Sequence, residues 1–231
     1  MHAYVKLLGA RAFAVESVCA WLVRELYLPG PEPFWVWVHR NRVPQIWPYE
    51  TDDPRLCFAT KAIMHARPIQ LLGPDRNSLT RQLGLDDRLI GRIATFDALI
   101  GNDDRHKGNL LWAPPAGVLL IDHEQAIGGV GFDLFSTLAP AGGNHFLEKI
   151  KNFSAQRRHA IKADLVSFCA SCADAVERLP YSELVPSPVL RAGVQDYLLK
   201  RADRLFETVS SALGMPELAG FARLDQRPAL P

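Results

Sequence analysis

Residues 101 to 127, GNDDRHKGNLLWAPPAGVLLIDHEQAI, gather polar side chains around a short apolar hairpin. Asp104 precedes Asn109 by five residues in one predicted loop, and the hairpin that follows ends at Asp122. Because Asn109 enters the hairpin and Asp122 leaves it, we expect both at its open end, near Asp104. Mg²⁺ prefers such oxygen ligands and completes its shell with water and substrate phosphates. The pattern therefore indicates phosphate chemistry supported by a metal ion.

The Asp-x-x-x-x-Asn spacing, followed by a hairpin and a second Asp, is that of protein-kinase catalytic loops. GNDDRHKGNLL followed by VLLIDHEQAI resembles the catalytic core of the HipA-like kinases. It is more distantly similar to the core of the phosphatidylinositol 3- and 4-kinases and the actin-fragmin kinases. Asp-Arg-His stands here where ordinary protein kinases have His-Arg-Asp, which is the atypical-kinase order. A polar turn between a helix and a strand is the alternative interpretation.

The resemblance implies a role for each residue of this stretch, with ATP and Mg²⁺ as cofactors. Asp104 would be the catalytic base, Arg105 would fix the loop, and His106 would brace the loop or contact the transition state. Asn109 and Asp122 would be the Mg²⁺ ligands.

The front of the chain offers the two residues that hold ATP in a kinase small lobe, a strand Lys and a helix Glu. Residues 3 to 8 are β-prone around Lys6, and residues 12 to 27 have a helical pattern that contains Glu16. HipA-like kinases resemble this stretch, including the exit LYLPGPEP. The alternative is that Lys6 extends along an edge strand into solvent and that Glu16 is a solvated helix charge.

The remaining pattern predicts strands early in the chain and helices late. The predicted strands are 33–40, 43–49 and the two arms of the hairpin, and the predicted helices are 86–101, 154–178 and 187–213, with Gly101 and Ser154 as caps. Residues 51 to 81 are turn-rich and could contain the hinge, with CFATK as a candidate. We predict an α+β, two-lobed kinase-like fold with an N-lobe over residues 1–60 and a helical C-lobe over 61–231.

The composition of the chain argues against several other classes of function. The 231 residues carry a net charge of +1, and neither a signal peptide nor an apolar run long enough for a membrane span is recognisable. We therefore expect a cytoplasmic protein that binds neither nucleic acid nor membrane. Cys169 and Cys172 form a C-x-x-C within a predicted helix, where packing is favoured over metal or redox chemistry.

Two features depart from ordinary kinases. Kinase small lobes place two strands and a glycine-rich loop before the Lys strand, but Lys6 lies five residues after Met1. A longer chain, a partner subunit or second copy that completes the N-lobe, or a weakened kinase would each explain this. Asp122-His123-Glu124 also replaces Asp-Phe-Gly, so a Phe-based activation switch is not expected.

The predicted function is transfer of the γ-phosphoryl group of MgATP to a hydroxyl, with Ser or Thr of a protein as the acceptor. Two alternatives remain open. The first is a pseudokinase that serves as a nucleotide-binding interaction module, which the missing glycine-rich loop favours. The second is a lipid or small-molecule kinase, although no basic cluster of the kind that recruits anionic lipids is present.

Overall fold

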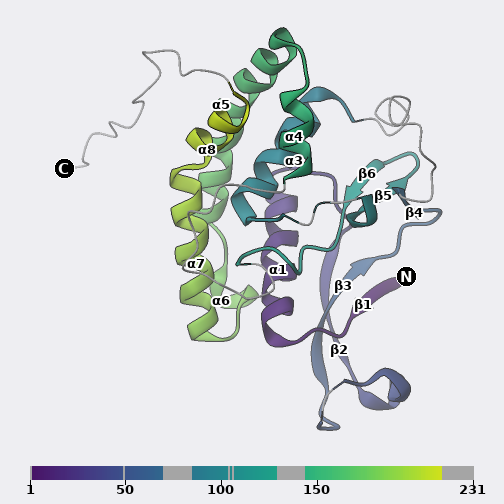
Figure 1. Cartoon of the computed structure of the whole chain (residues 1–231). Helices are drawn as coiled ribbons and strands as arrows, with labels where there is room; N and C mark the ends of the chain where they lie inside the picture. Colours follow the sequence, from purple (N-terminus) through teal and green to yellow (C-terminus); the bar gives the residue numbers. More distant parts are fainter. Residues whose placement is uncertain are drawn as a thin grey trace.

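The computed structural model describes residues 2–48, 50–69, 85–103, 105, 107–128 and 144–214. Among the described residues every strand lies before residue 121, together with two α-helices, and only helices follow, so the strands come early and most helices late, as the sequence predicts (Figure 1). The first half contains β1 (Ala3–Lys6), α1 (Ala10–Glu25), β2 (Pro33–Val38), β3 (Arg55–Lys61), β4 (Arg67–Pro68), α3 (Asp87–Ile100), β5 (Leu110–Ala113) and β6 (Gly117–Leu120). The second half contains α4 (His145–Lys151), α5 (Ala155–Glu177), α6 (Tyr181–Leu184), α7 (Pro188–Asp203) and α8 (Leu205–Ala212).

The N-terminal sheet is antiparallel with the strand order β1-β3-β2. Lys6 and Trp35 both lie opposite Phe58, so these three side chains share one face of the sheet. That face is turned toward α1, because the Trp35 indole N–H donates to the Ser17 hydroxyl at 3.0 Å. Helix α1 packs against β2 and β3 and also against α5 and α6, and so lies between the sheet and the helical lobe (Figure 1).

The second sheet has the order β4-β5-β6 and contains the predicted hairpin. Leu110 pairs with Leu120 and Ala113 with Gly117, which places the residues before β5 and after β6 at the same open end. The Leu120 N–H also donates to the Pro29 carbonyl at 2.8 Å. This bond ties the hairpin to the loop that follows α1, and so brings the C-terminal end of β6 close to the N-terminal sheet.

Helix α3 is the central element of the helical lobe and packs against α4, α5, α7 and α8. The Asp86 side chain caps its N-terminus by accepting from the Leu89 N–H at 2.7 Å. Gly101 ends the helix with φ of 63°, which confirms the predicted cap. A Cβ at Gly101 would also lie 2.0 Å from the Tyr197 hydroxyl, so glycine is required there for space as well as for conformation.

The cysteines predicted to serve packing do so. Cys169 and Cys172 are both buried within α5, and burial raises the pKa of each thiol. Ser154 caps this helix through the Arg157 N–H, as predicted. Within the part of the chain that the structure describes, no helix combines the length and the hydrophobicity needed to cross a bilayer.

Three predicted elements differ in the structure. Residues 43–48 of the predicted strand 43–49 contain the 3₁₀ turn Pro44–Ile46 and no strand, because Pro44 and Pro48 cannot donate to a sheet ladder. The third strand of the N-terminal sheet is β3 instead, within the stretch that we interpreted as turn-rich. The predicted helix 187–213 is divided into α7 and α8 at Arg204.

Candidate active site

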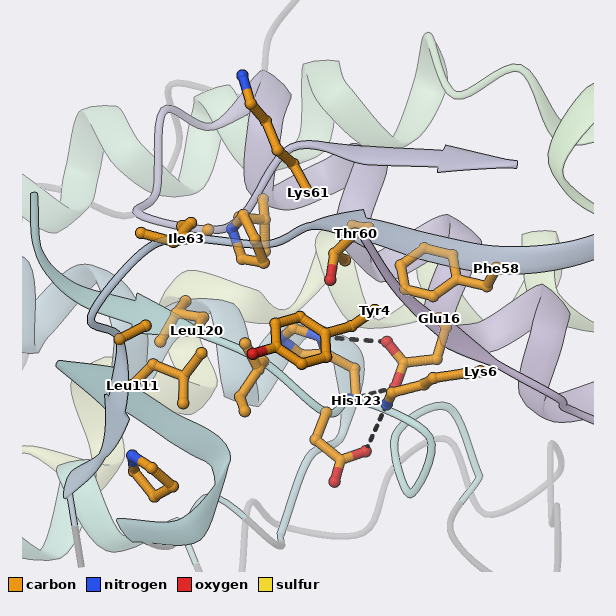
Figure 2. Close-up of a pocket in the computed structure, with 18 residues that line it drawn as sticks. Tyr4, Lys6, Glu16, Phe58, Thr60, Lys61, Ile63, Leu111, Leu120 and His123 are labelled. Atoms are coloured by element: carbon orange, nitrogen blue, oxygen red, sulfur yellow. Dashed lines mark hydrogen bonds and ion pairs between the residues drawn. The ribbon is translucent and has the colours of Figure 1, made fainter. Parts of the chain in front are cut away.

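Three charged side chains from distant parts of the chain meet in the structure. Lys6 ends β1, Glu16 lies in α1, and Asp122 follows β6 by two residues. The Lys6 Nζ lies 2.5 Å from Glu16 Oε1 and 2.8 Å from Asp122 Oδ1 (Figure 2). The structure therefore brings together the strand Lys, the helix Glu and the Asp that leaves the hairpin.

The electrostatics of this cluster keep both Lys6 and Glu16 ionised. Burial would lower the pKa of Lys6, but the Glu16 and Asp122 carboxylates outweigh it and raise that pKa above its usual value. Burial would likewise raise the pKa of Glu16, but contacts with His123 and Lys6 lower it to about 2. At neutral pH the buried carboxylate thus has a permanent cation as its partner.

Glu16 also fixes the backbone that follows Asp122. Its Oε1 accepts a hydrogen bond from the His123 N–H at 3.0 Å, and His123 Nδ1 lies 3.8 Å from Oε2. The His123 ring is 3% exposed and meets the Phe96 ring edge-on at 5.8 Å. Burial lowers the pKa of His123, so its imidazole is neutral at pH 7. His123 is therefore a buried, neutral side chain that packs on Phe96 beside Glu16.

The backbone at Asp122 turns sharply, with φ of 60°. Asp tolerates this left-handed conformation better than most residues, although it is still unfavourable. Arg11, at the start of α1, donates to the carbonyls of Glu124 and Ala126, both at 3.1 Å. The Ile127 N–H donates to Ile100 O at 2.7 Å. These bonds stabilise the turn at Asp122.

A buried ion pair braces the loop before the hairpin. Arg105 Nη2 lies 2.8 Å from Asp97 Oδ1, and both side chains are 0% exposed. Arg105 Nη1 donates to the carbonyls of Asn109 at 3.2 Å and of Ile121 at 3.1 Å. Asn102 Nδ2 also donates to Asp97 Oδ1, at 3.1 Å. Arg105 thus links α3 to both ends of the hairpin.

The described residues include only part of the predicted catalytic loop. Asp104 and His106 lie outside the described residues. Asn109 is 5% exposed, and its carbonyl accepts from the Ile121 N–H at 3.1 Å, directly before Asp122. Arg105 is 1% exposed, which fits a role in fixing the loop.

A cavity of about 340 Å³ lies beside the charged cluster. Lys6, Glu16, Asp122 and His123 supply much of its polar wall. The rest of the lining is mainly apolar and comes from the N-terminal sheet, α1 and the loop after it, the β3–β4 connection, β4, and the hairpin with the residue after it: Tyr4, Ala20, Val23, Gly30, Pro31, Phe58, Thr60, Lys61, Ile63, Ala66, Pro68, Leu111, Leu120 and Ile121. Such a cavity suits a ligand that has both a polar and an apolar part.

Three carboxylates at this site could hold a metal ion. One oxygen each from Glu16, Asp122 and Glu124 lie within 4.8 Å of one another. An all-oxygen donor set fits Mg²⁺, so the residues present are compatible with the predicted ion. Of the two predicted ligands, Asp122 belongs to this set and to the cavity wall, whereas Asn109 does not line the cavity.

Sequence reasoning missed Glu124, Asp97 and Arg11. Glu124 had a local signal, because it lies two residues after Asp122. Asp97 had one as well: it is an acidic residue among the apolar positions of a helix, where burial requires a partner. Arg11 had none, since its contacts with Glu124 and Ala126 span more than 110 residues.

No protein-family model and no curated protein matches the sequence. Among solved structures, the crystal structure of CtkA, a proinflammatory kinase of Helicobacter pylori, matches with a TM-score of 0.53. The match covers 91% of this chain and 90% of that one. The chain has a two-lobed, kinase-like fold. Sequence identity over the match is 10%, so the likeness concerns the fold and not the substrate.

Proposed function

We propose that this protein is a HipA-like, ATP-dependent kinase that transfers the γ-phosphoryl group of MgATP to a hydroxyl of Ser or Thr in a protein. The observation that carries the proposal is the ion-paired cluster of Lys6, Glu16 and Asp122 at one wall of a largely apolar cavity. It lies within a kinase-like fold, and each residue comes from the element that the kinase resemblance implies.

Each residue has a defined task in this proposal. Lys6 binds the α- and β-phosphates, and Glu16 holds Lys6 in place. Asp122, together with Asn109 or Glu124, holds Mg²⁺, which neutralises charge on the phosphates when bound.

The residues that act on the acceptor hydroxyl lie in the loop that Arg105 stabilises. Asp104 orients the acceptor hydroxyl and takes its proton as the new P–O bond forms and the bond to ADP breaks. His106 supports the loop or the transferring phosphoryl group. Positioning and charge neutralisation account for most of the rate in such a reaction.

ATP binding by calorimetry, with and without Mg²⁺, is the first test. We expect Mg²⁺-dependent binding by the wild type, and loss of that dependence in Asp122→Asn. Asp196→Asn is the matched control, because it removes an exposed carboxylate on α7. The absence of ATP binding, or full Mg²⁺ dependence in Asp122→Asn, would contradict the proposed site.

Transfer of labelled γ-phosphate is the second test. Asp104→Asn should abolish transfer while ATP still binds, and wild-type transfer by this variant would refute the assignment. ATP binding without transfer to any acceptor would instead identify a nucleotide-binding interaction module. Protein lysate and lipid vesicles, offered separately, distinguish a protein kinase from a lipid kinase. A co-encoded partner is included, because a partner subunit or second copy that completes the N-lobe is one of the open alternatives.

A further inference from the structure

Two buried side chains of α7 contact the end of α3, where the predicted catalytic loop begins. Tyr197 and Arg201 are 3% and 9% exposed and, being four positions apart, share one face of α7. The Arg201 guanidinium donates to the Ala98 carbonyl through Nε at 2.8 Å and Nη2 at 2.6 Å, and so satisfies a carbonyl near the C-terminal end of α3. The Tyr197 hydroxyl occupies the space that a Cβ of Gly101 would need. Helix α7 therefore holds α3 at the point from which the loop starts.

Arg201 also acts on the loop itself through its charge. Partial burial raises the pKa of Asp103, and the positive charge of Arg201 opposes this rise. The guanidinium therefore attracts the Asp103 carboxylate, and Asp103 directly precedes Asp104 in the sequence. Arg201 thus holds the end of α3 through a backbone carbonyl and attracts the loop after α3 through a carboxylate.

Tyr197 in addition lies beside the segment that follows the proposed metal ligand Asp122. Burial raises the pKa of the Tyr197 hydroxyl, and a hydrogen bond from the Gly128 backbone is among the contacts that oppose this rise. Gly128 follows Asp122 by six residues. The residue before it, Ile127, donates its N–H to Ile100 O at 2.7 Å. The Tyr197 hydroxyl therefore lies where the end of α3 meets the end of the turn at Asp122.

We propose that Tyr197 and Arg201 are positioning residues for phosphoryl transfer, which hold the catalytic loop and the segment after Asp122 in a fixed relative position. This inference rests on the proposed function and adds to it two residues that do not line the cavity. Transfer requires the reacting groups in a near-attack geometry, and a displacement of about 1 Å can lower the rate about a hundredfold. ATP affinity should not depend on the pair, because Lys6 and its partners come from other elements.

The test uses two conservative variants, each with a matched control. Tyr197→Phe keeps the ring and removes the hydroxyl, and Arg201→Lys keeps the charge and removes the planar guanidinium. Tyr181→Phe is the control for the first variant, because Tyr181 is also buried and its hydroxyl donates to Val176 O at 3.1 Å. Arg191→Lys is the control for the second, because Arg191 lies on the same helix and donates to two backbone carbonyls of the α6–α7 connection.

The rate of transfer and the binding of ATP are measured separately. The initial rate of transfer of labelled γ-phosphate to lysate protein is followed over a range of MgATP concentrations, at a temperature where thermal melting shows every variant to be folded. The maximal rate should fall at least about tenfold in Tyr197→Phe and in Arg201→Lys. The dissociation constant of MgATP, measured by calorimetry, should not change. Both controls should resemble the wild type in rate and in affinity.

The possible outcomes distinguish this inference from the proposed function. Wild-type maximal rates in both Tyr197→Phe and Arg201→Lys would overturn the inference and leave the proposed function intact. An equal loss of rate in the controls, or a parallel loss of ATP affinity, would also overturn it, because general packing would then account for the effect. A loss in one variant alone refutes the role of the other residue. The absence of transfer by the wild type would refute the proposed function and this inference with it.

Discussion

Replacing Asp97 with alanine should destabilise the fold far more than the loss of an ordinary surface ion pair. Arg105 Nε and Nη2 lie 2.8 to 3.2 Å from the Asp97 oxygens, and both side chains are 0% exposed. The substitution leaves a guanidinium buried without its counter-charge, which costs about 3 to 5 kcal/mol. That is a large share of the roughly 5 to 15 kcal/mol that stabilises a typical domain.

Urea unfolding followed by tryptophan fluorescence measures this cost. With a slope of about 2 to 3 kcal/mol per molar urea, Asp97→Ala should lower the unfolding midpoint by roughly 1 to 2.5 M. Asp196→Ala is the control, because its pair with Lys200 is more than half exposed on both sides. Removing an exposed helix pair of this type costs about 0.3 to 0.5 kcal/mol.

A double variant, Asp97→Leu with Arg105→Met, separates stability from the positioning of the loop. It should recover part of the stability lost in Asp97→Ala, since no unpaired charge stays buried. Under the proposed function it should still transfer phosphate poorly, because the carbonyls of Asn109 and Ile121 lose their donor. If Asp97→Ala cost under about 1 kcal/mol, or the double variant were the less stable of the two, the proposed role of this pair would be wrong.

Three further perturbations follow from the structure. Burial lowers the pKa of His123 from its usual 6.5, so the unfolded chain takes up the proton at a higher pH than the folded protein does. The free energy of unfolding of the wild type should therefore decrease as the pH is lowered past about 6.5. Urea titrations in EDTA should show a smaller decrease for His123→Phe. Gly101→Ala should lower the free energy of unfolding, measured in urea, by at least about 1 kcal/mol. Adding Tyr197→Phe to this variant removes the hydroxyl that the new Cβ would meet, but it should restore only part of the loss, because the backbone φ of 63° is still unfavourable for alanine. Glu124→Gln should raise the Mg²⁺ concentration for half-maximal ATP binding roughly tenfold if Glu124 is a ligand, and unchanged Mg²⁺ dependence would exclude that role.

Local patterns in the sequence were sufficient to predict the elements that hold the charged cluster. The helix around Glu16 and the hairpin before Asp122 each have a periodicity and turn residues within a short window. The meeting of Lys6 with Asp122 spans 116 residues, and the kinase resemblance supplied that expectation rather than any local pattern.

Other features depend on partners that are distant in the sequence. Strand β3 is the centre of its sheet, and its apolar core of Cys57, Phe58 and Ala59 is too short to distinguish strand from turn among flanking turn residues. The ion pair between Asp97 and Arg105 would have been easier to predict, since the two residues are only eight positions apart. The feature that indicates it is an acidic side chain among the buried positions of α3, which requires a partner of opposite charge.

The two carboxylates that contact Lys6 differ in how readily another anion can replace them as its partner. The Glu16 side chain is 2% exposed, whereas that of Asp122 is 42% exposed. Separating Lys6 from Glu16 would leave a buried charge without its cation, while Asp122 can be rehydrated. Under the proposed function, an incoming phosphate therefore displaces Asp122 from Lys6 and leaves Glu16 in place. The released Asp122 carboxylate is then free to bind Mg²⁺ beside Glu124. Because both ligands require Lys6 and Asp122 to separate, each strengthens the binding of the other.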